Sequence, residues 1–263
     1  MRYFSSIKKT VSFFFIVLFF SCASKKDIVY YQNIDILQKQ EKGTSYEIKI
    51  QPDDLLMIIV SAEDPEIAAP FNLNTVSVVS VDKQDTPGLQ SAQLYLVDTM
   101  GNINFPILGK LKISGMTRSE VLEMLCKKIS TYIKNPMVNL RVMNFKVSLQ
   151  GEVNSPGTYT VVSERLTLIE ALSMAKDLTI YGKRHNILII REIDGVKSYN
   201  RVDITKAEFI NSPFYYLSQN DVVYVEPNKT RINGAAVGSN TGVIISVSSL
   251  IITLITLIVT SSK

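Results

Sequence analysis

The sequence predicts an α+β protein made of two small units, followed by an apolar helix near its C-terminus. Short alternating or continuous apolar segments, typical of strands, are interleaved with two expected helices. The helices begin at similar boxes, Thr117-x-x-Glu120 and Thr167-x-x-Glu170. Such a box caps a helix N-terminus. Its recurrence predicts two related α+β units, with chance as the alternative because capping boxes are common.

The first unit is expected to open with strands. Residues 46–50 alternate between polar and apolar, and residues 55–60 are continuously apolar, with a turn between them. After a predicted loop at residues 82–92, the pattern at 95–105 predicts strand, turn and strand. A helix is expected from residue 118 to 133, where its apolar face comprises Val121, Leu122, Leu125, Ile129 and Ile133.

Proline ends this first helix, because Asn135-Pro136 disfavours further helical backbone. Strands are then expected at residues 137–143 and 146–153, a turn at 154–157, and a strand at 158–162. The second helix is predicted at 168–175. Later strands are predicted at 187–191, 197–202 and 222–225.

Residues 242–260 carry no charge over 19 positions, a length that spans about 29 Å as a helix and predicts a membrane helix. Its hydroxyl residues recur every three or four positions: Ser246, Ser249, Thr253, Thr256 and Thr260. That spacing places them in one seam, which favours association with a neighbouring helix or a water-filled lumen. The alternative is a single anchor whose hydroxyls bond back to their own helix.

The N-terminus has the pattern of a secretory leader. Arg2, Lys8 and Lys9 precede an apolar stretch at residues 11–20 that is too short to span a bilayer. Ser21-Cys22 then resembles a bacterial lipobox, which predicts acylation of Cys22. The alternative is an ordinary secretory signal that happens to precede a cysteine. Several acyl chains would hold the protein stably on a membrane.

The composition gives little support to nucleic-acid binding or catalysis. The net charge of +4 comes mostly from the three leader cations, and no basic cluster is present. Cys22 and Cys126 are the only cysteines, so acylation of Cys22 excludes an intrachain disulfide. The sequence has one histidine, His185, and lacks a P-loop, G-x-G-x-x-G and G-x-S-x-G. We therefore predict no catalytic residue, metal or cofactor.

Six motifs in order resemble the polysaccharide export family and its soluble-ligand-binding β-grasp (SLBB) domain. The first four are YEIKIQPDDLLMIIV at residues 46–60, YLVDTMGNINFPILG at 95–109, GMT at 115–117 and YIKNPMV at 132–138. The others are GEVNSPGTYT at 151–160 and LTLIEAL at 166–172, followed by Ala175. The chain is thus similar to Wza-type outer-membrane export lipoproteins.

The residue patterns of the two ends and the resemblance, which covers about residues 46–226, together predict a domain organisation. It comprises a lipoprotein signal peptide at 1–21, a tether at 22–45, a polysaccharide export domain at 46–144, an SLBB β-grasp domain at 145–226, a linker at 227–241 and a membrane helix at 242–260. Motif residues expected to set turns and the fold are Pro52, Asp54, Gly109, Gly151, Pro156 and Gly157.

The resemblance also implies a function without catalysis. Identical subunits form a ring in the outer membrane, anchored at Cys22, with the main body in the periplasm. The ring exports capsular polysaccharide or exopolysaccharide and works with an inner-membrane co-polymerase of the tyrosine-kinase type. Besides the co-polymerase, the expected partners are further copies of this protein, the glycan and outer-membrane lipid, and no nucleic acid. The alternatives are a glycan- or peptidoglycan-binding adaptor without a pore, and a glycan hydrolase.

Two positions depart from the family pattern. Asp53 stands where glycine usually precedes Asp54, and Lys176-Asp177 stands where a glycine pair is common. The first turn is therefore expected to differ from that of other members. Only one β-grasp domain follows, which predicts a shorter periplasmic stack.

Overall fold

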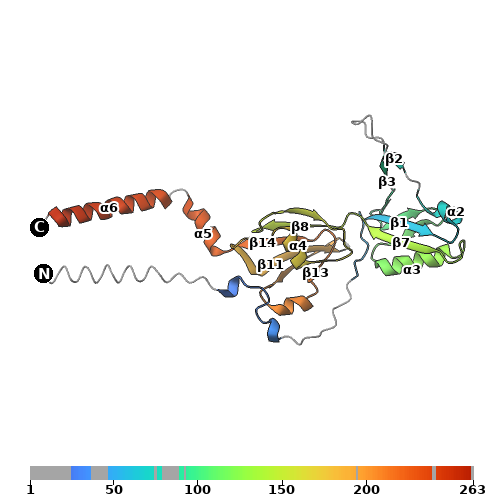
Figure 1. The fold of residues 1–263 in the computed structure, drawn as a ribbon, viewed down its shortest axis with the longest axis horizontal. Helices are drawn as coiled ribbons and strands as arrows, with labels where there is room; N and C mark the ends of the chain where they lie inside the picture. The colour runs from blue at the N-terminus through green and yellow to red at the C-terminus, as the bar shows by residue number, and fades with distance from the viewer. Residues whose placement is uncertain are drawn as a thin grey trace.

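The computed structural model describes residues 25–36, 47–73, 76–78, 89–91, 93–193, 195–238 and 241–261. Within these ranges the chain forms two hydrophobic cores that follow one another along the long axis (Figure 1). The predicted α+β class is confirmed. Cys22 and the predicted signal peptide at 1–21 lie outside the described residues.

The first core is built on a three-stranded antiparallel sheet in the order β4-β1-β7, and helix α3 packs on β7. Its buried side chains include Leu56, Ile58, Leu125 and Leu140. The elements are β1 (Leu55–Ser61), α2 (Pro65–Ala68), η3 (Ala69–Phe71), β2 (Val76–Val78), β3 (Leu89–Ser91), β4 (Tyr95–Leu96), β5 (Asn102–Phe105), β6 (Gly109–Lys112), α3 (Arg118–Ile129) and β7 (Met137–Val142).

The second core is built on a five-stranded sheet in the order β12-β11-β14-β8-β9, in which only β14 and β8 run parallel. Leu149, Leu172, Ile189 and Val223 are buried in it. Its elements are β8 (Lys146–Gly151), β9 (Gly157–Thr160), β10 (Leu166–Thr167), α4 (Leu168–Met174), β11 (Gly182–Ile193), β12 (Val196–Val202), η4 (Ala207–Asn211), β13 (Tyr216–Leu217) and β14 (Val222–Pro227).

Both predicted helix caps are confirmed. Thr117 accepts a hydrogen bond from the Glu120 amide, and the Glu120 carboxylate accepts one from the Thr117 amide. Thr167 and Glu170 make the same reciprocal pair at the start of α4. The two units therefore share a helix-start device, although their sheets differ in strand number and order.

Several predicted elements differ from the structure. Residues 47–50 form a single bridge between Lys49 and Thr117 instead of a strand, and α3 ends at Ile129, one turn before Ile133. The predicted strand, turn and strand at 95–105 are present as β4, a turn at 99–100 and β5. However, β4 pairs with β1, and β5 pairs with β6, a strand that the sequence pattern did not reveal. The predicted loop at 82–92 lies mostly outside the described residues, but 89–91 forms β3.

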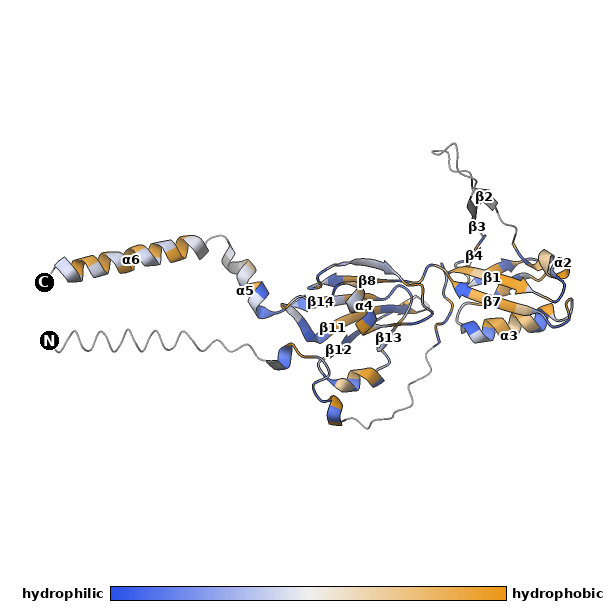
Figure 2. Cartoon of the chain, viewed as in Figure 1, coloured by the Kyte–Doolittle hydropathy of each residue, from blue (hydrophilic) through white to orange (hydrophobic). Residues whose placement is uncertain are grey.

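The C-terminal region is helical, as predicted, but it does not form the predicted transmembrane helix. Helices α5 (Lys229–Val237) and α6 (Thr241–Ser261) follow the second core, and α6 stands clear of both cores (Figure 1). Among the residues described, no helix combines the length and apolarity needed to cross a membrane, so the predicted transmembrane helix at 242–260 is wrong. That prediction rested on the absence of charge, whereas hydroxyl residues recur throughout the run. Figure 2 shows this mixture along α6.

Candidate functional site: the junction between the two cores

The junction between the cores is built from two turns of the same design. In the first, the Gln51 amide donates to Asp54 Oδ2 at 2.8 Å, and the Asp54 amide donates back to the Gln51 carbonyl at 3.2 Å. Asp53 at the third position has φ 69°. This left-handed backbone favours glycine and is tolerated by aspartate. The turn leads directly into β1.

The second turn repeats this pattern at residues 218–221. The Ser218 amide donates to Asp221 Oδ2 at 2.8 Å, and the Asp221 amide donates to the Ser218 carbonyl at 3.2 Å. Asn220 takes the third position, with φ 63°. This turn leads into β14, a central strand of the five-stranded sheet. Each core therefore opens a central strand with an aspartate-closed turn.

Asn144 joins the two turns. Its side-chain oxygen accepts from the Leu55 amide at 2.9 Å, and its side-chain nitrogen donates to the Asp53 carbonyl at 2.8 Å. The buried Gln219 side chain then donates to the Asn144 carbonyl and accepts from the Lys146 amide, both at 2.8 Å. These bonds satisfy backbone groups of both cores. Asn144 and Gln219 thus fix how the chain passes from one core to the other.

The two turn aspartates have different surroundings. Asp54 is 1% exposed, and its Oδ1 accepts no hydrogen bond in the described part of the chain. Burial, together with the nearby Asp53 charge, raises the pKa of Asp54 to about 6, although the Gln51 amide and the Gln219 side chain oppose that rise. Asp54 therefore titrates closer to neutral pH than an ordinary aspartate.

Asp221 is fully buried but has a cation beside it. Arg191 Nε lies 3.0 Å from Asp221 Oδ1, and Arg191 Nη2 lies 2.7 Å from Oδ2. The same guanidinium donates to the Tyr216 carbonyl and lies 5.2 Å from the centre of the Phe214 ring. Burial raises the pKa of Asp221, whereas the Arg191 contacts lower it. This two-pronged pair is the geometry that best compensates a buried charge.

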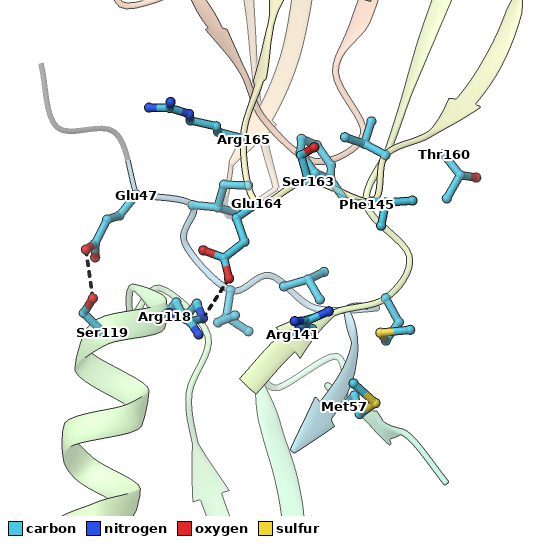
Figure 3. Close-up of a pocket in the computed structure, with 16 residues that line it drawn as sticks. Glu47, Met57, Arg118, Ser119, Arg141, Phe145, Thr160, Ser163, Glu164 and Arg165 are labelled. Atoms are coloured by element: carbon cyan, nitrogen blue, oxygen red, sulfur yellow. Dashed lines mark hydrogen bonds and ion pairs between the residues drawn. The ribbon is translucent and has the colours of Figure 1, made fainter. Parts of the chain in front are cut away.

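A cleft of about 710 Å³ opens beside this junction, between the end of the first sheet and the loop that follows β9 (Figure 3). Arg118 at the start of α3 and Arg141 on β7 lie at its first-core side, and Arg118 faces Glu164 of the loop. Arg118 Nε donates to the Leu140 carbonyl at 2.9 Å and lies 3.4 Å from the Glu164 carboxylate. Ser119 donates to Glu47 at 2.8 Å. The cleft is therefore lined by polar and charged side chains as well as apolar ones.

The segment before the first core packs on the second core. The Gln32 amide donates to the Thr205 carbonyl at 2.8 Å, and the Asn33 side chain contacts both Glu208 and the Ala207 amide. Tyr30 donates to Asp177 at 2.5 Å, and Arg184 lies over the Tyr30 ring. Residues 25–36, which belong to the predicted tether, are therefore held against the second core.

Among the predicted turn glycines, Gly151 is the most constrained. Its φ is 87°, and a Cβ placed there would lie 2.1 Å from the Val225 carbonyl oxygen. Gly109 has φ 73° at the β5–β6 turn but open space around it. A Cβ added at Gly157 would lie 3.9 Å from its nearest neighbour, and Pro156 is exposed. Only Gly151 is thus required by both conformation and space.

The seam residues on α6 all bond within their own helix. The hydroxyls of Ser246, Thr253 and Thr256 donate to the carbonyl four residues earlier, and Ser249 donates three residues back. Thr260 donates to both Thr256 and Leu257. Large apolar side chains on α6 are at least half exposed, among them Leu250 and Ile258. Because its hydroxyls are already hydrogen-bonded within the helix, α6 presents mainly an apolar surface to a partner.

The described residues contain no group of three or more histidine, cysteine or acidic side chains placed to hold a metal ion. His185 is exposed on β11, and Cys126 is a partly buried thiol on α3.

The first part of the chain matches a known family. Residues 42–143 match the family model described as polysaccharide biosynthesis/export protein. The resemblance to the polysaccharide export family is confirmed. The matched residues include the Asp54 turn and two of the three arginines that line the cleft, Arg118 and Arg141, whereas the Asp221 turn lies beyond them.

Two relatives carry the name EPS I polysaccharide export outer membrane protein EpsA. The protein of Ralstonia solanacearum is 29% identical over 218 residues, covering 80% of this chain and 56% of the relative. The protein of Ralstonia nicotianae (strain ATCC BAA-1114 / GMI1000) is 32% identical over 166 residues, covering 61% of this chain and 42% of the relative. The chain therefore spans about half the length of these polysaccharide export relatives.

Sequence reasoning missed the residues that assemble the junction. Asn144, Gln219 and the Arg191–Asp221 pair lie between or inside predicted strands, and no motif marks them. One signal was present: an acidic or amide residue followed by Asp and an apolar strand occurs at both Asp53-Asp54 and Asn220-Asp221. Taken together, these two dipeptides predict a repeated turn.

Proposed function

We propose that this chain is a subunit of an oligomeric outer-membrane conduit that exports exopolysaccharide without catalysis. The observation that carries this proposal is the match of residues 42–143 to the polysaccharide biosynthesis/export family, supported by relatives named as outer-membrane export proteins. The subunit supplies a passage and a docking face, and the driving energy comes from an inner-membrane co-polymerase of the tyrosine-kinase type. The body of the protein lies in the periplasm.

Lipidation at Cys22 gives the subunit its orientation. Residues 25–36 pack on the second core, and only a few residues separate them from Cys22. At about 3.5 Å per extended residue, acyl chains on Cys22 hold the second core within roughly 10 Å of the lipid surface. The first core then faces away from that surface, towards the inner membrane and the proposed co-polymerase.

Association of several copies places α6 helices side by side. The helix exposes large apolar side chains that a monomer leaves in water, and its small seam residues Ser246, Ser249, Thr253, Thr256 and Thr260 allow close approach. Since the seam hydroxyls are satisfied within the helix, packing is the main contribution to association. Replacing Ser249 and Thr253 together with leucine is expected to shift detergent-extracted protein towards smaller oligomers.

A deletion strain tests the proposed function. Loss of the chain is expected to abolish cell-surface polysaccharide, with polymer retained inside the envelope, and the wild-type gene on a plasmid is expected to restore export. A Cys22→Ser variant is expected to lose radiolabelled palmitate and to leave the outer-membrane fraction. Normal surface polysaccharide in the deletion strain contradicts the proposal. Unchanged palmitate labelling in the Cys22→Ser variant contradicts the anchor.

A further inference from the structure

The cleft at the junction contains guanidinium groups whose donors the protein does not use. Arg118 contacts Leu140 and Glu164 through Nε, and no described residue accepts a hydrogen bond from its terminal nitrogens. Arg141 pairs with Met57 through its backbone, but its side chain makes no hydrogen bond or ion pair with any part of the chain that the structure describes. An arginine has five donors in a fixed plane, which suits two oxygens of one carboxylate or phosphate.

The shape and lining of the cleft restrict the kind of ligand. Its volume of about 710 Å³ is that of a pocket for a small oligosaccharide. Hydroxyl residues Ser119, Thr160 and Ser163 line it together with the apolar side chains of Met57 and Met143. Figure 3 shows Met57 on the first-core side of the cleft. A sugar chain presents hydroxyls at its edges and C–H groups on its faces, so it matches both kinds of surface.

The charges of the cleft favour an anionic ligand. Glu164 is the acidic side chain nearest Arg118, and it is exposed, with 66% of its side chain accessible. The Glu47 carboxylate accepts a hydrogen bond from the Ser119 hydroxyl. Arg165 also lines the cleft, but its guanidinium points away from the centre and lies 5.9 Å from the Tyr216 ring centre (Figure 3). Within the described lining, neither Arg141 nor Arg165 has an acidic partner, but the Arg165 guanidinium points away from the cleft, so Arg141 is the cation available to a ligand. Glu164 is an exposed competitor for Arg118.

We propose that this cleft binds a carboxylate-bearing segment of a polysaccharide, with Arg141 as the anchor of the carboxylate and Arg118 as its second contact. The inference rests on the proposed export function, because it names acidic glycan as the substrate class. When the ligand enters, its carboxylate replaces the Glu164 carboxylate beside Arg118. Glu164 therefore opposes binding, and the two kinds of substitution have opposite effects.

The test is calorimetric titration of the full-length protein in detergent with trigalacturonate. The wild type is expected to bind, and Arg141→Gln to bind about ten-fold more weakly because a charge-assisted pair is lost. Glu164→Gln is expected to bind about two- to five-fold more tightly, as removal of an exposed competing charge implies. Arg165→Gln is the matched control, since its guanidinium lies outside the proposed contacts, and its affinity is expected to equal that of the wild type.

Two further titrants separate the ligand sources. Maltotriose, which has the hydroxyls but no carboxylate, is expected to bind much more weakly than trigalacturonate. Inorganic phosphate is expected to compete only at far higher concentration. Phosphate that binds as tightly as trigalacturonate would show a simple anion site and overturn the proposal, as would equal affinity of the wild type and Arg141→Gln. So would absence of trigalacturonate binding, the result expected if a second copy fills the cleft.

The outcomes for the cleft and for the function are distinguishable. If the deletion strain exports polysaccharide normally, the proposed function fails whatever the titrations give. If the deletion blocks export but Arg141→Gln and Glu164→Gln both bind trigalacturonate as the wild type does, only the cleft inference fails. Each variant is compared with the wild type by circular dichroism, so that loss of folding is not read as loss of binding.

Discussion

In each core the same kind of turn precedes a central strand, but the surroundings of the buried aspartate in that turn differ. Asp54 and Asp221 both accept a hydrogen bond from the amide three residues earlier, and both follow a residue in the left-handed region. Asp221 is paired with Arg191, whereas Asp54 has an oxygen without a hydrogen-bond partner in the described chain. The turn geometry therefore requires the carboxylate oxygen but not its charge.

The comparison predicts that the two cores respond differently to pH and to mutation. The second core depends on keeping an ion pair intact, because a buried charge without its partner is strongly destabilising. The first core depends on the protonation state of a single carboxyl group. Asn144 and Gln219 connect the two turns through hydrogen bonds of their side-chain amides.

The largest effect is expected from Arg191→Met. This change leaves the Asp221 charge buried without a cation and should lower the free energy of unfolding by about 3–5 kcal/mol. Urea denaturation of the full chain, followed by circular dichroism, measures the effect. Adding Asp221→Asn should recover part of the loss, since asparagine keeps the turn acceptor. Arg201→Met is the control, because its ion pair with Glu226 is half exposed and should contribute less than about 1 kcal/mol. Equal losses from Arg191→Met and Arg201→Met would remove the contrast between the cores.

The second-largest effect expected is the pH dependence of the stability of the first core. A pKa of about 6 for Asp54 in the folded protein lies above the ordinary aspartate value of 3.8, so the folded state binds the proton more tightly than the unfolded state. Stability of the first core should therefore rise as pH falls, by about 2 kcal/mol between about pH 7.5 and 4.5. Hydrogen exchange, corrected for intrinsic rates, should show greater protection of β1 and α3 at the lower pH. An Asp54→Asn variant should lose this dependence, and its persistence there would exclude Asp54 as the source.

The smallest effect compares the two helix caps. Thr117→Ala and Thr167→Ala should each cost about 1 kcal/mol, because each removes an acceptor from a capping box. Thr167 should cost slightly more, since its hydroxyl also donates to Glu170 and α4 has only 7 residues against 12 in α3. Thermal unfolding of both variants, with a serine substitution at each site as the control, measures the difference. A larger loss at Thr117 would mean that the shorter helix relies less on its cap.

Local sequence patterns predicted many of the helices and strands. Capping boxes fix Thr117 and Thr167 as helix starts, and continuous apolar runs mark β1 and β14, because these signals depend on neighbours in sequence. Strand pairing was less predictable. The pairing of β4 with β1, rather than with β5, depends on contacts between segments some forty residues apart, which periodicity does not encode.

The candidate site was predictable only in part. Asp54 and Gly151 were identified from motifs, and the structure gives a physical reason for each. The cleft was not predicted, since Arg118, Arg141 and Glu164 come from three separate elements and meet only after both cores have folded. The backbone at Lys176 and Asp177 is left-handed, with φ 59° and 65°, a conformation that glycine adopts without strain, so it gives a physical reason for the glycine pair that the family resemblance leads us to expect there.

Native mass spectrometry of the full-length protein, extracted from outer membranes in mild detergent, tests the central claim most directly. The account predicts one dominant species with the mass of a closed ring of many identical subunits. A monomer or dimer as the dominant species, under conditions that preserve other membrane oligomers, would contradict the conduit and favour an adaptor without a pore.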